Sequence, residues 1–239
     1  ARTTWSRTAT CSISASRTER KPVPELFFED FVAGEAKTFG RHTVEAADMV
    51  AFARDYDDQP FHVDEAAAKA SPVGRLIASG WYTLGLTMRL MVEDWLLRAA
   101  IAGGVGIDGH RWLRPVGAGD VLSVRQVTGE GRPSTRRPDI GIVPFEVETL
   151  DGEGRPVMRF VHHVALFRRD GPARPSFRAP DPAPPPEAIF PAPDPATAPR
   201  WFDDVVPGRG FDLGTVAFTP DSIVSFAMRF DPQGFHLDP

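Results

Sequence analysis

Apolar side chains recur at helical spacing in two short segments that lie far apart in the chain. The first segment carries Met49, Phe52, Ala53 and Tyr56, and the second carries Ile223, Phe226, Ala227 and Phe230. Their spacing of i, i+3, i+4 and i+7 predicts one buried face of a short amphipathic helix in each segment. Thr219-Pro220-Asp221 strengthens the second prediction, because a Thr cap, a Pro at the first helical position and an acidic residue mark a helix N-terminus.

A longer apolar segment, from Gly80 to about residue 101, predicts a helix on the order of 30 Å long at 1.5 Å per residue. Gly103-Gly104 follows it and is typical of a helix terminus. The charged side chains within the segment argue for a helix of a soluble domain and against a membrane span. Because the helix is apolar on most sides, it needs other elements wrapped around it.

Three segments that follow this helix alternate apolar and polar residues, are rich in β-branched residues and are divided by glycine-rich turns. They cover residues 109–130, 140–154 and 155–169. This pattern predicts strands of an antiparallel sheet. One long helix packed against an antiparallel sheet is an α+β arrangement, which is the fold class that we expect.

Two parts of the sequence repeat one another at an offset of 174 residues. Residues 26–64 overlay residues 200–238 without a gap, and the shared positions include matching glycines. Both copies contain the pattern D-x-Q-x-F-H just after the predicted short helix: Asp57, Gln59, Phe61 and His62 match Asp231, Gln233, Phe235 and His236. The final block therefore begins a second copy of the first one.

Composition divides the chain into four regions. Residues 1–24 are rich in Ser, Thr and Arg, and we expect a disordered tail there, with an organelle transit peptide as the alternative. Residues 25–170 form the predicted main domain. Residues 171–199 are dominated by Pro and Ala and predict a semi-rigid linker. Residues 200–239 form the incomplete second repeat.

The overall composition excludes several classes of protein. The chain has 239 residues, of which 42% are hydrophobic and 25% charged, and its net charge of −5 argues against a nucleic-acid binder. Cys11 is the single cysteine, so there is no internal disulfide, and a cytoplasmic location is expected. No uncharged apolar run reaches about 18 residues, so we expect no membrane span. No His, Glu or Cys spacing predicts a metal site.

Asp57 and His62 are the first candidates for chemistry. A carboxylate and an imidazole within reach of each other can share one water, and the imidazole can accept and return a proton near neutral pH. A turn forced by Pro60 can bring the two side chains together, on a loop that the preceding helix holds. The alternative is an Asp–His hydrogen bond with a purely structural role.

Gly80 is the second candidate, because it stands at the expected N-terminus of the long helix. The first N–H groups of a helix have no helical partner and can donate to an oxygen that gains negative charge. The alternative is a plain helix start, with Ser79 as the cap and Gly80 allowing close packing.

The sequence resembles the MaoC-like dehydratases, the (R)-specific enoyl-CoA hydratase group of the hot-dog fold. The resemblance rests on D-D-Q-P-F-H at 57–62, I-A-S-G-W at 77–81 and R-W-L-R-P-V-G-A-G-D-V-L at 111–122. It spans residues 25–170 and again 200–239, and it implies a tandem-repeat type whose second repeat is cut short. Gln59 stands where the family motif usually has Asn, and Gly234 replaces the motif proline in the second copy.

The resemblance implies a hydro-lyase that adds water to a trans-2-enoyl thioester or removes it from a 3-hydroxyacyl thioester. Asp57 and His62 would activate the water, the Gly80 N–H would polarise the thioester carbonyl, and Gln59, Ser79 and Trp81 would contact substrate. The arginine-rich loops, which carry Arg111, Arg114, Arg132, Arg136 and Arg137, would meet the phosphates of CoA; the alternative for each arginine is a solvated loop face. No metal or redox cofactor is implied.

The second motif, Asp231, Gln233 and His236, is expected to form no working site, because its copy lacks the glycine element and the long helix. The first unit is then expected to pair with a second chain in a homodimer through the hot-dog sheet. Neither a nucleic acid nor a membrane is an expected partner. The alternatives are a hot-dog acyl-CoA thioesterase and a non-catalytic half of a double hot-dog that only binds acyl thioesters.

Overall fold

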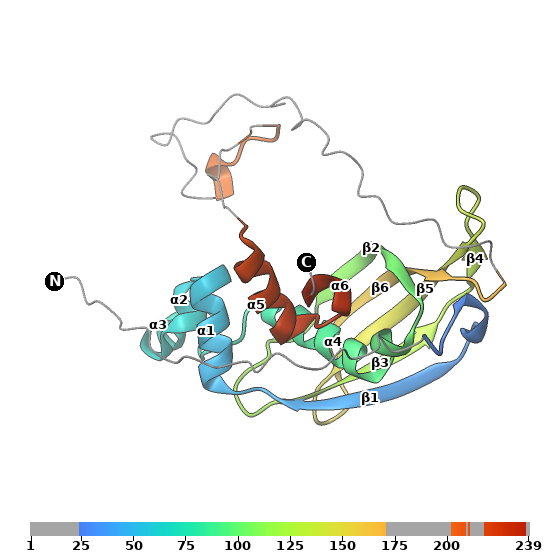
Figure 1. Cartoon of the computed structure of the whole chain (residues 1–239). Coiled ribbons are helices and arrows are strands. Elements are labelled where there is room, and N and C mark those ends of the chain that lie inside the picture. Colours follow the sequence, from blue (N-terminus) through green and yellow to red (C-terminus); the bar gives the residue numbers. More distant parts are fainter. Residues whose placement is uncertain (1–23, 171–201, 209, 211–217, 238–239) are drawn as a thin grey trace, which may run out of the picture.

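One helix and one antiparallel sheet form the centre of the molecule. The structure is a computed structural model and describes residues 24–170, 202–208, 210 and 218–237. The central helix α4 (Gly80–Asp94) lies along one face of the sheet (Figure 1). The helices α1 (Ala46–Tyr56), α2 (Pro60–Val63) and α3 (Glu65–Ala70) gather near the N-terminal end of α4. This is the predicted α+β class.

The sheet has the strand order β1-β3-β5-β6-β2, and every neighbouring pair is antiparallel. Its strands are β1 (Ala36–Thr43), β2 (Ile101–Trp112), β3 (Val121–Thr128), β5 (Ile140–Leu150) and β6 (Pro156–Phe167). The two-residue strand β4 (Arg132–Pro133) pairs with β5. The three predicted strand-rich segments are therefore confirmed. Because β2 ends the order, one of its edges has no strand beside it within the described residues.

The core forms where α4 meets the sheet. The buried face of α4 carries Tyr82, Leu86 and Leu90, which join strand residues such as Val124 and Phe145 in one apolar cluster. Trp95, just beyond the helix, is fully buried and packs 4.9 Å from the Phe145 ring, measured between ring centroids. Its indole N–H donates to the side-chain oxygen of Gln126 at 3.1 Å, so the polar end of this large residue is satisfied inside the core.

The predicted extent of the central helix is wrong at its C-terminal end. The helix ends at Asp94, and a single 3-10 turn, η2 (Leu96–Arg98), follows it. Gly103 and Gly104 do not end a helix; they lie in β2, opposite Ala165 and Val164 of β6. The apolar residues beyond Asp94 fill the core and begin an edge strand. They are apolar because they are buried, and not because they continue the helix.

The repeat found in the sequence is also a repeat of structure. The 3-10 turn η1 (Phe28–Asp30) matches η4 (Phe202–Asp204), α1 matches α5 (Pro220–Phe230), and α2 matches α6 (Gly234–Leu237), all at the offset of 174. Gly34 and Gly208, which are paired by this offset, have φ angles of +88° and +83°. Such positive φ angles favour glycine, so the matched glycines do form matched turns. Residues 211–217, which the offset pairs with most of β1, lie outside the described residues.

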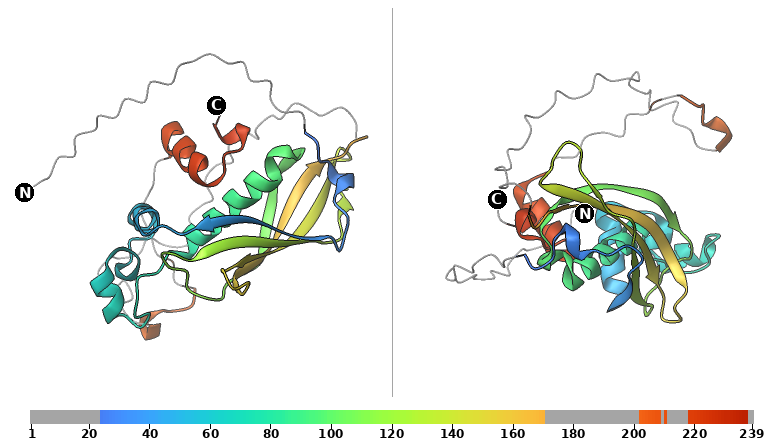
Figure 2. Two further views of the ribbon diagram at one scale, coloured as in Figure 1. Left: turned by 90° about the horizontal axis from the view of Figure 1, so that it is seen from below. Right: turned by 90° about the vertical axis from the view of Figure 1, so that its right-hand side faces the viewer.

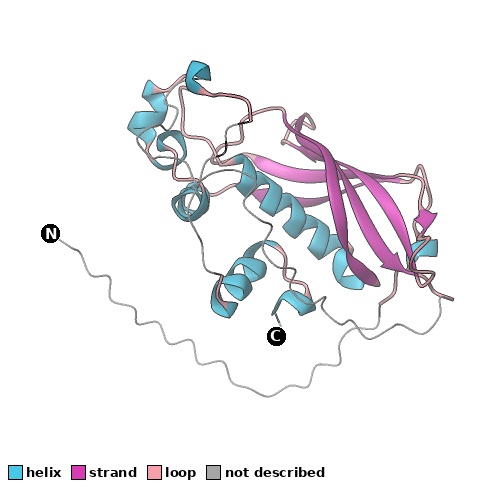
Figure 3. Ribbon diagram, turned by 90° about the horizontal axis from the view of Figure 1, so that it is seen from above, coloured by secondary structure: helices cyan, strands magenta, loops and turns pink. Residues whose placement is uncertain are grey.

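The helix α5 of the second copy rests on α4 of the first. The helices α5 and α6 lie on the side of α4 that faces away from the sheet (Figures 2 and 3). Thr219 caps α5 and Pro220 begins it, as predicted. The predicted tail, apart from Pro24, and the predicted linker lie outside the described residues. No helix in the described part of the chain combines the length and apolar character needed to cross a bilayer.

His162 and His163 point to opposite faces of β6, as their adjacent positions in a strand require. His163 is partly exposed and lies 2.9 Å from the Asp108 carboxylate. His162 is nine-tenths buried. Burial, with a smaller effect of the neighbouring His163 charge, lowers the pKa of His162 from 6.5 to about 4.

We predict that His162 makes the fold sensitive to acid. The pKa of His162 is lower in the folded state than in the unfolded chain. Above pH about 6.5 the ring is neutral in both states and has no effect on the pH dependence. As the pH falls from about 6.5 toward about 4, only the unfolded chain takes up the proton, so the free energy of unfolding decreases. In urea unfolding at pH 7 and at pH 4, the wild type should lose about 3 kcal/mol more than His162→Leu. His163→Leu is the matched control and should keep the acid sensitivity. Equal losses in the wild type and His162→Leu would contradict the assignment.

Candidate functional site

The end of α1 and the start of α2 position the Asp57–His62 motif. Asp57 follows α1 directly, and its N–H donates to the carbonyl of Ala53 at 2.7 Å. Gln59 has the extended backbone expected before a proline, and Pro60 opens α2. Asp57 and Gln59 thus lie in a loop, as predicted, while His62 lies in a one-turn helix instead of the loop.

Three side chains converge on the Asp57 carboxylate. The Ser79 hydroxyl donates to Oδ2 at 2.7 Å, and the Gln59 amide donates to Oδ1 at 2.7 Å. The Nε2 atom of His62 lies 3.4 Å from Oδ2. Burial raises the pKa of the Asp57 carboxyl, but the hydrogen bonds from Ser79 and Gln59 and the charge of His62 together lower the pKa below its usual value. The carboxylate is therefore ionised at neutral pH.

The orientation of the His62 ring is fixed from its other side. Its Nδ1 atom lies 2.8 Å from the carbonyl oxygen of Ile77. A carbonyl only accepts, so this contact assigns the proton to Nδ1 and leaves Nε2 as the acceptor in the neutral ring. Nε2 and the Asp57 carboxylate then present two neighbouring acceptors. Sequence reasoning missed Ile77, because a backbone carbonyl leaves no mark in the residue pattern.

Gly80 begins α4, and Ser79 caps that helix by accepting the Trp81 N–H at 3.2 Å. A Cβ atom at position 80 would lie 2.4 Å from Nε1 of Trp112, so only glycine fits beneath this indole. The Gly80 N–H donates to no other group within the described residues. Ser79 is thus a helix cap and Gly80 allows a close contact, as the plain-helix-start interpretation predicts, while the oxyanion role of the Gly80 N–H stays a prediction.

A cavity of about 430 Å³, called here the site cavity, brings most of the predicted residues together. Asp57, Gln59, His62, Gly80 and Trp81 all line it. Ser79 is fully buried and does not line the cavity, but its hydroxyl donates to Asp57, which does.

The opposite wall of the site cavity comes from β2 and the residues after it. Trp112 packs edge-to-face on Trp81, with ring centroids 5.3 Å apart, and Arg114 also lines the cavity. The size of the cavity suits a small-molecule ligand.

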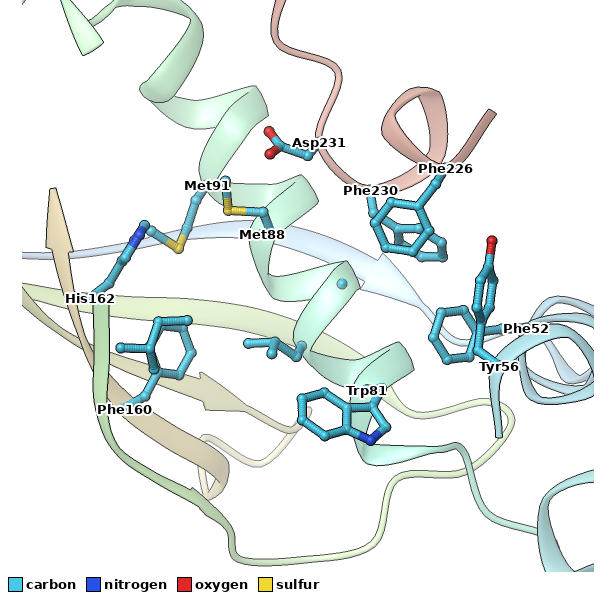
Figure 4. Close-up of a pocket in the computed structure, with 13 residues that line it drawn as sticks. Phe52, Tyr56, Trp81, Met88, Met91, Phe160, His162, Phe226, Phe230 and Asp231 are labelled. Atoms are coloured by element: carbon cyan, nitrogen blue, oxygen red, sulfur yellow. The ribbon is translucent and has the colours of Figure 1, made fainter. Parts of the chain in front are cut away.

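A second cavity, called here the apolar cavity, shares Trp81 with the site cavity. It measures about 510 Å³. Figure 4 shows Phe226 and Phe230 on one side and Phe160 and His162 on the opposite side, with Met88 and Met91 of α4 between them. Asp231 also contributes to the wall.

The second motif repeats the backbone of the first but not all of its contacts. Asp231 has φ and ψ of −151° and 65°, against −155° and 63° for Asp57, and Gln233 donates to Asp231 as Gln59 does to Asp57. The ring of His236, however, turns its Nδ1 toward Asp231, 3.1 Å from Oδ2.

The described residues contain no group of three or more His, Cys, Asp or Glu side chains placed to hold a metal ion. The expectation that the reaction needs neither a metal nor a redox cofactor stays a prediction.

The sequence is similar to those of known proteins. A family model described as a MaoC-like domain matches residues 30–142. The 3-hydroxybutyryl-CoA dehydratase of Methylorubrum extorquens is 33% identical over 133 residues, which are 54% of this chain and 81% of that protein. The chain belongs to the MaoC-like dehydratase family.

Solved structures agree with the family assignment. The crystal structure of a MaoC-like dehydratase from Rhodospirillum rubrum is 42% identical and has a TM-score of 0.56; the match covers 60% of this chain and 98% of that one. A MaoC domain protein from Chloroflexus aurantiacus is 18% identical with a TM-score of 0.67, over 93% of this chain and 66% of that one. The latter shows fold alone, and together they confirm the hot-dog fold.

We predict that the Ser79 hydroxyl holds both the Asp57 carboxylate and the start of α4. In Ser79→Ala the pKa of Asp57 should rise, because burial remains while one donor is lost, and the free energy of unfolding should fall by about 1 kcal/mol. Carbon-13 NMR titration, assigned with Asp57→Asn, and urea unfolding measure the two effects.

Ser71→Ala is the control for Ser79→Ala. Its hydroxyl donates to the Ala68 carbonyl at the end of α3 and has no contact with Asp57. An unchanged Asp57 pKa in Ser79→Ala, or an equal rise in Ser71→Ala, would show that the hydroxyl does not control the carboxylate.

Proposed function

We propose that this MaoC-like dehydratase reversibly hydrates trans-2-enoyl thioesters to 3-hydroxyacyl thioesters at the site cavity of its first copy. The observation that carries the proposal is the arrangement of two acceptors, the Asp57 carboxylate and His62 Nε2, beside the free N–H of Gly80 on one cavity. The relative from Methylorubrum extorquens, named 3-hydroxybutyryl-CoA dehydratase, supports the same reaction class.

The two acceptors suit a single water. A water that donates one hydrogen to the Asp57 carboxylate and the other to His62 Nε2 turns its oxygen lone pairs toward the substrate. His62 Nε2 takes one proton from the water as the hydroxyl bonds to C3, and the protonated imidazole returns that proton to C2, so one water is consumed for each double bond removed. The Gly80 N–H stabilises the negative charge that develops on the thioester oxygen. Dehydration follows the same steps in reverse.

The walls of the two cavities suggest how the substrate lies. With the thioester at Gly80, Arg114, which lines the site cavity, would meet the phosphates of CoA or of a carrier-protein arm. Trp81 lines both the site cavity and the apolar cavity, so an acyl chain that passes Trp81 would enter apolar surroundings. Trp81 is therefore the substrate-contacting residue that divides the polar part of the substrate from the acyl chain.

We expect His62→Gln to lower kcat/KM for hydration of crotonyl-CoA at least about 100-fold, because it removes the group that takes the proton of water. Loss of enoyl absorbance measures the rate. His236→Gln, the same change in the second motif, is the matched control and should leave the rate close to wild type. A folded His62→Gln variant with full activity would refute the proposed role.

The alternatives predicted from the sequence separate in the same assay. A hot-dog thioesterase would release free thiol from crotonyl-CoA without forming 3-hydroxybutyryl-CoA. A non-catalytic binding unit would bind acyl-CoA and do neither. Hydration without thiol release is the result that supports the proposal.

We also propose that the protein pairs with a second copy along β2. This strand leaves one edge without a neighbour in the described chain, and the side chain of Val105 on it is exposed. An unprotected apolar edge of this kind favours pairing with another strand. The four-region division, the cytoplasmic location and the inactivity of the second motif stay predictions.

Val105→Lys should convert the dimer to a monomer, because a lysine on a strand edge opposes edge-to-edge pairing. Light scattering coupled to size-exclusion chromatography measures the mass. Val32→Lys is the control, since Val32 and Val105 are both 55% exposed and Val32 lies outside the sheet. A monomeric wild type, or equal dissociation in both variants, would contradict the β2 interface.

A further inference from the structure

The apolar cavity is built from both copies of the repeat. Its floor comes from α4 and from strands β2 and β6 of the first copy, through residues such as Met88, Ile107 and Phe160. Its roof comes from α5 of the second copy, through Phe226 and Phe230. The second copy therefore contributes to a space that opens beside the first copy's site, at Trp81.

A glycine in the middle of α4, Gly85, allows the Phe230 ring of α5 to pack directly against the helix. Glycine within a helix costs about 1 kcal/mol relative to alanine, so Gly85 needs a compensating contact. A Cβ atom at this position would lie 2.8 Å from Cδ1 of Phe230. Phe230 is almost fully buried, and its ring meets Phe52 at 5.5 Å and Tyr82 at 6.2 Å between centroids. The missing side chain at position 85 is the space that Phe230 fills.

Arg89, one turn further along the same face of α4, holds the end of α5. Its Nη1 atom donates to the carbonyl oxygens of Met228 at 2.7 Å and Arg229 at 3.2 Å. The last carbonyls of a helix lack partners within that helix, so a cation that donates to them stabilises its end. Gly85 and Arg89 thus place α5 by shape and by charge.

We propose that α5 is the roof of the acyl-chain pocket of the first copy's site, and that it selects thioesters with apolar acyl chains longer than the four carbons of crotonyl-CoA. This inference rests on the proposed hydratase function. The cavity walls are largely apolar, and the roof keeps water from the far end of a chain that has passed Trp81. Phe226 and Phe230 are the specificity-determining residues, and Asp57, His62 and Gly80 act on the thioester end alone.

The test is the ratio of affinities for octanoyl-CoA and butyryl-CoA, measured by calorimetric titration of the full chain. Both ligands are saturated, so neither can be hydrated and binding is measured apart from turnover. Phe230→Ala removes the anchor of the roof, and the preference for octanoyl-CoA should fall about tenfold as apolar enclosure is lost. Ile223→Ala is the matched control, because Ile223 is on the same helix, is 48% exposed and does not line the cavity.

Gly85→Ala is a second variant that removes no atoms. Alanine suits a helix interior better than glycine, so α4 should remain folded, while the added Cβ must displace the Phe230 ring. The same fall in octanoyl preference is expected. An unchanged ratio in both folded variants, or an equal fall in Ile223→Ala, would overturn the proposal.

The outcomes separate this inference from the proposed function. If the wild type hydrates crotonyl-CoA but its octanoyl preference is unchanged in Phe230→Ala and Gly85→Ala, the role of α5 as the roof is refuted and the hydratase function is still supported. An octanoyl preference that falls in both variants, in a protein that hydrates no enoyl-CoA, would support the pocket and refute the reaction.

Discussion

The Ser79 hydroxyl is the group on which the site depends most directly. Its oxygen accepts the Trp81 N–H at the start of α4, and its proton goes to the Asp57 carboxylate. One buried hydroxyl therefore fixes where the central helix begins, which places the Gly80 N–H, and it also fixes the carboxylate that faces the same cavity. The loop that carries Asp57 and the helix that carries Gly80 are separated in sequence, and this contact fixes their positions relative to each other.

The repeat separates what local sequence determines from what the surrounding fold determines. The two motifs share almost the same backbone angles at Asp57 and Asp231, and both glutamines donate to their aspartates. The histidine rings differ, because His62 is held by the Ile77 carbonyl and His236 turns to its own aspartate. The turn is thus a property of the motif, while the imidazole geometry is supplied by residues further along the chain.

The same distinction explains what could be predicted from the sequence. The helices α1 and α5, the three strand-rich segments from residue 109 onward and the repeat followed from spacing and glycine positions, because these depend on neighbours in the chain. The C-terminal end of α4 did not, since the residues after Asp94 are apolar for the sake of the core and of β2 rather than of a helix. Asp57, His62 and Gly80 were found through their motifs. The Ile77 carbonyl and the Gly85–Phe230 contact were not, because both exist only once distant segments meet.

The contact between Gly80 and Trp112 links two positions in evolution as well as in space. With an indole at position 112, any side chain at position 80 collides with it at 2.4 Å. A lineage that replaced Trp112 by a small residue would free position 80 to accept alanine or serine, whereas a lineage that kept the indole would not. Positions 80 and 112 are thus expected to change together in evolution. A homologue with a side chain at position 80 should have a small residue at position 112 in place of the indole.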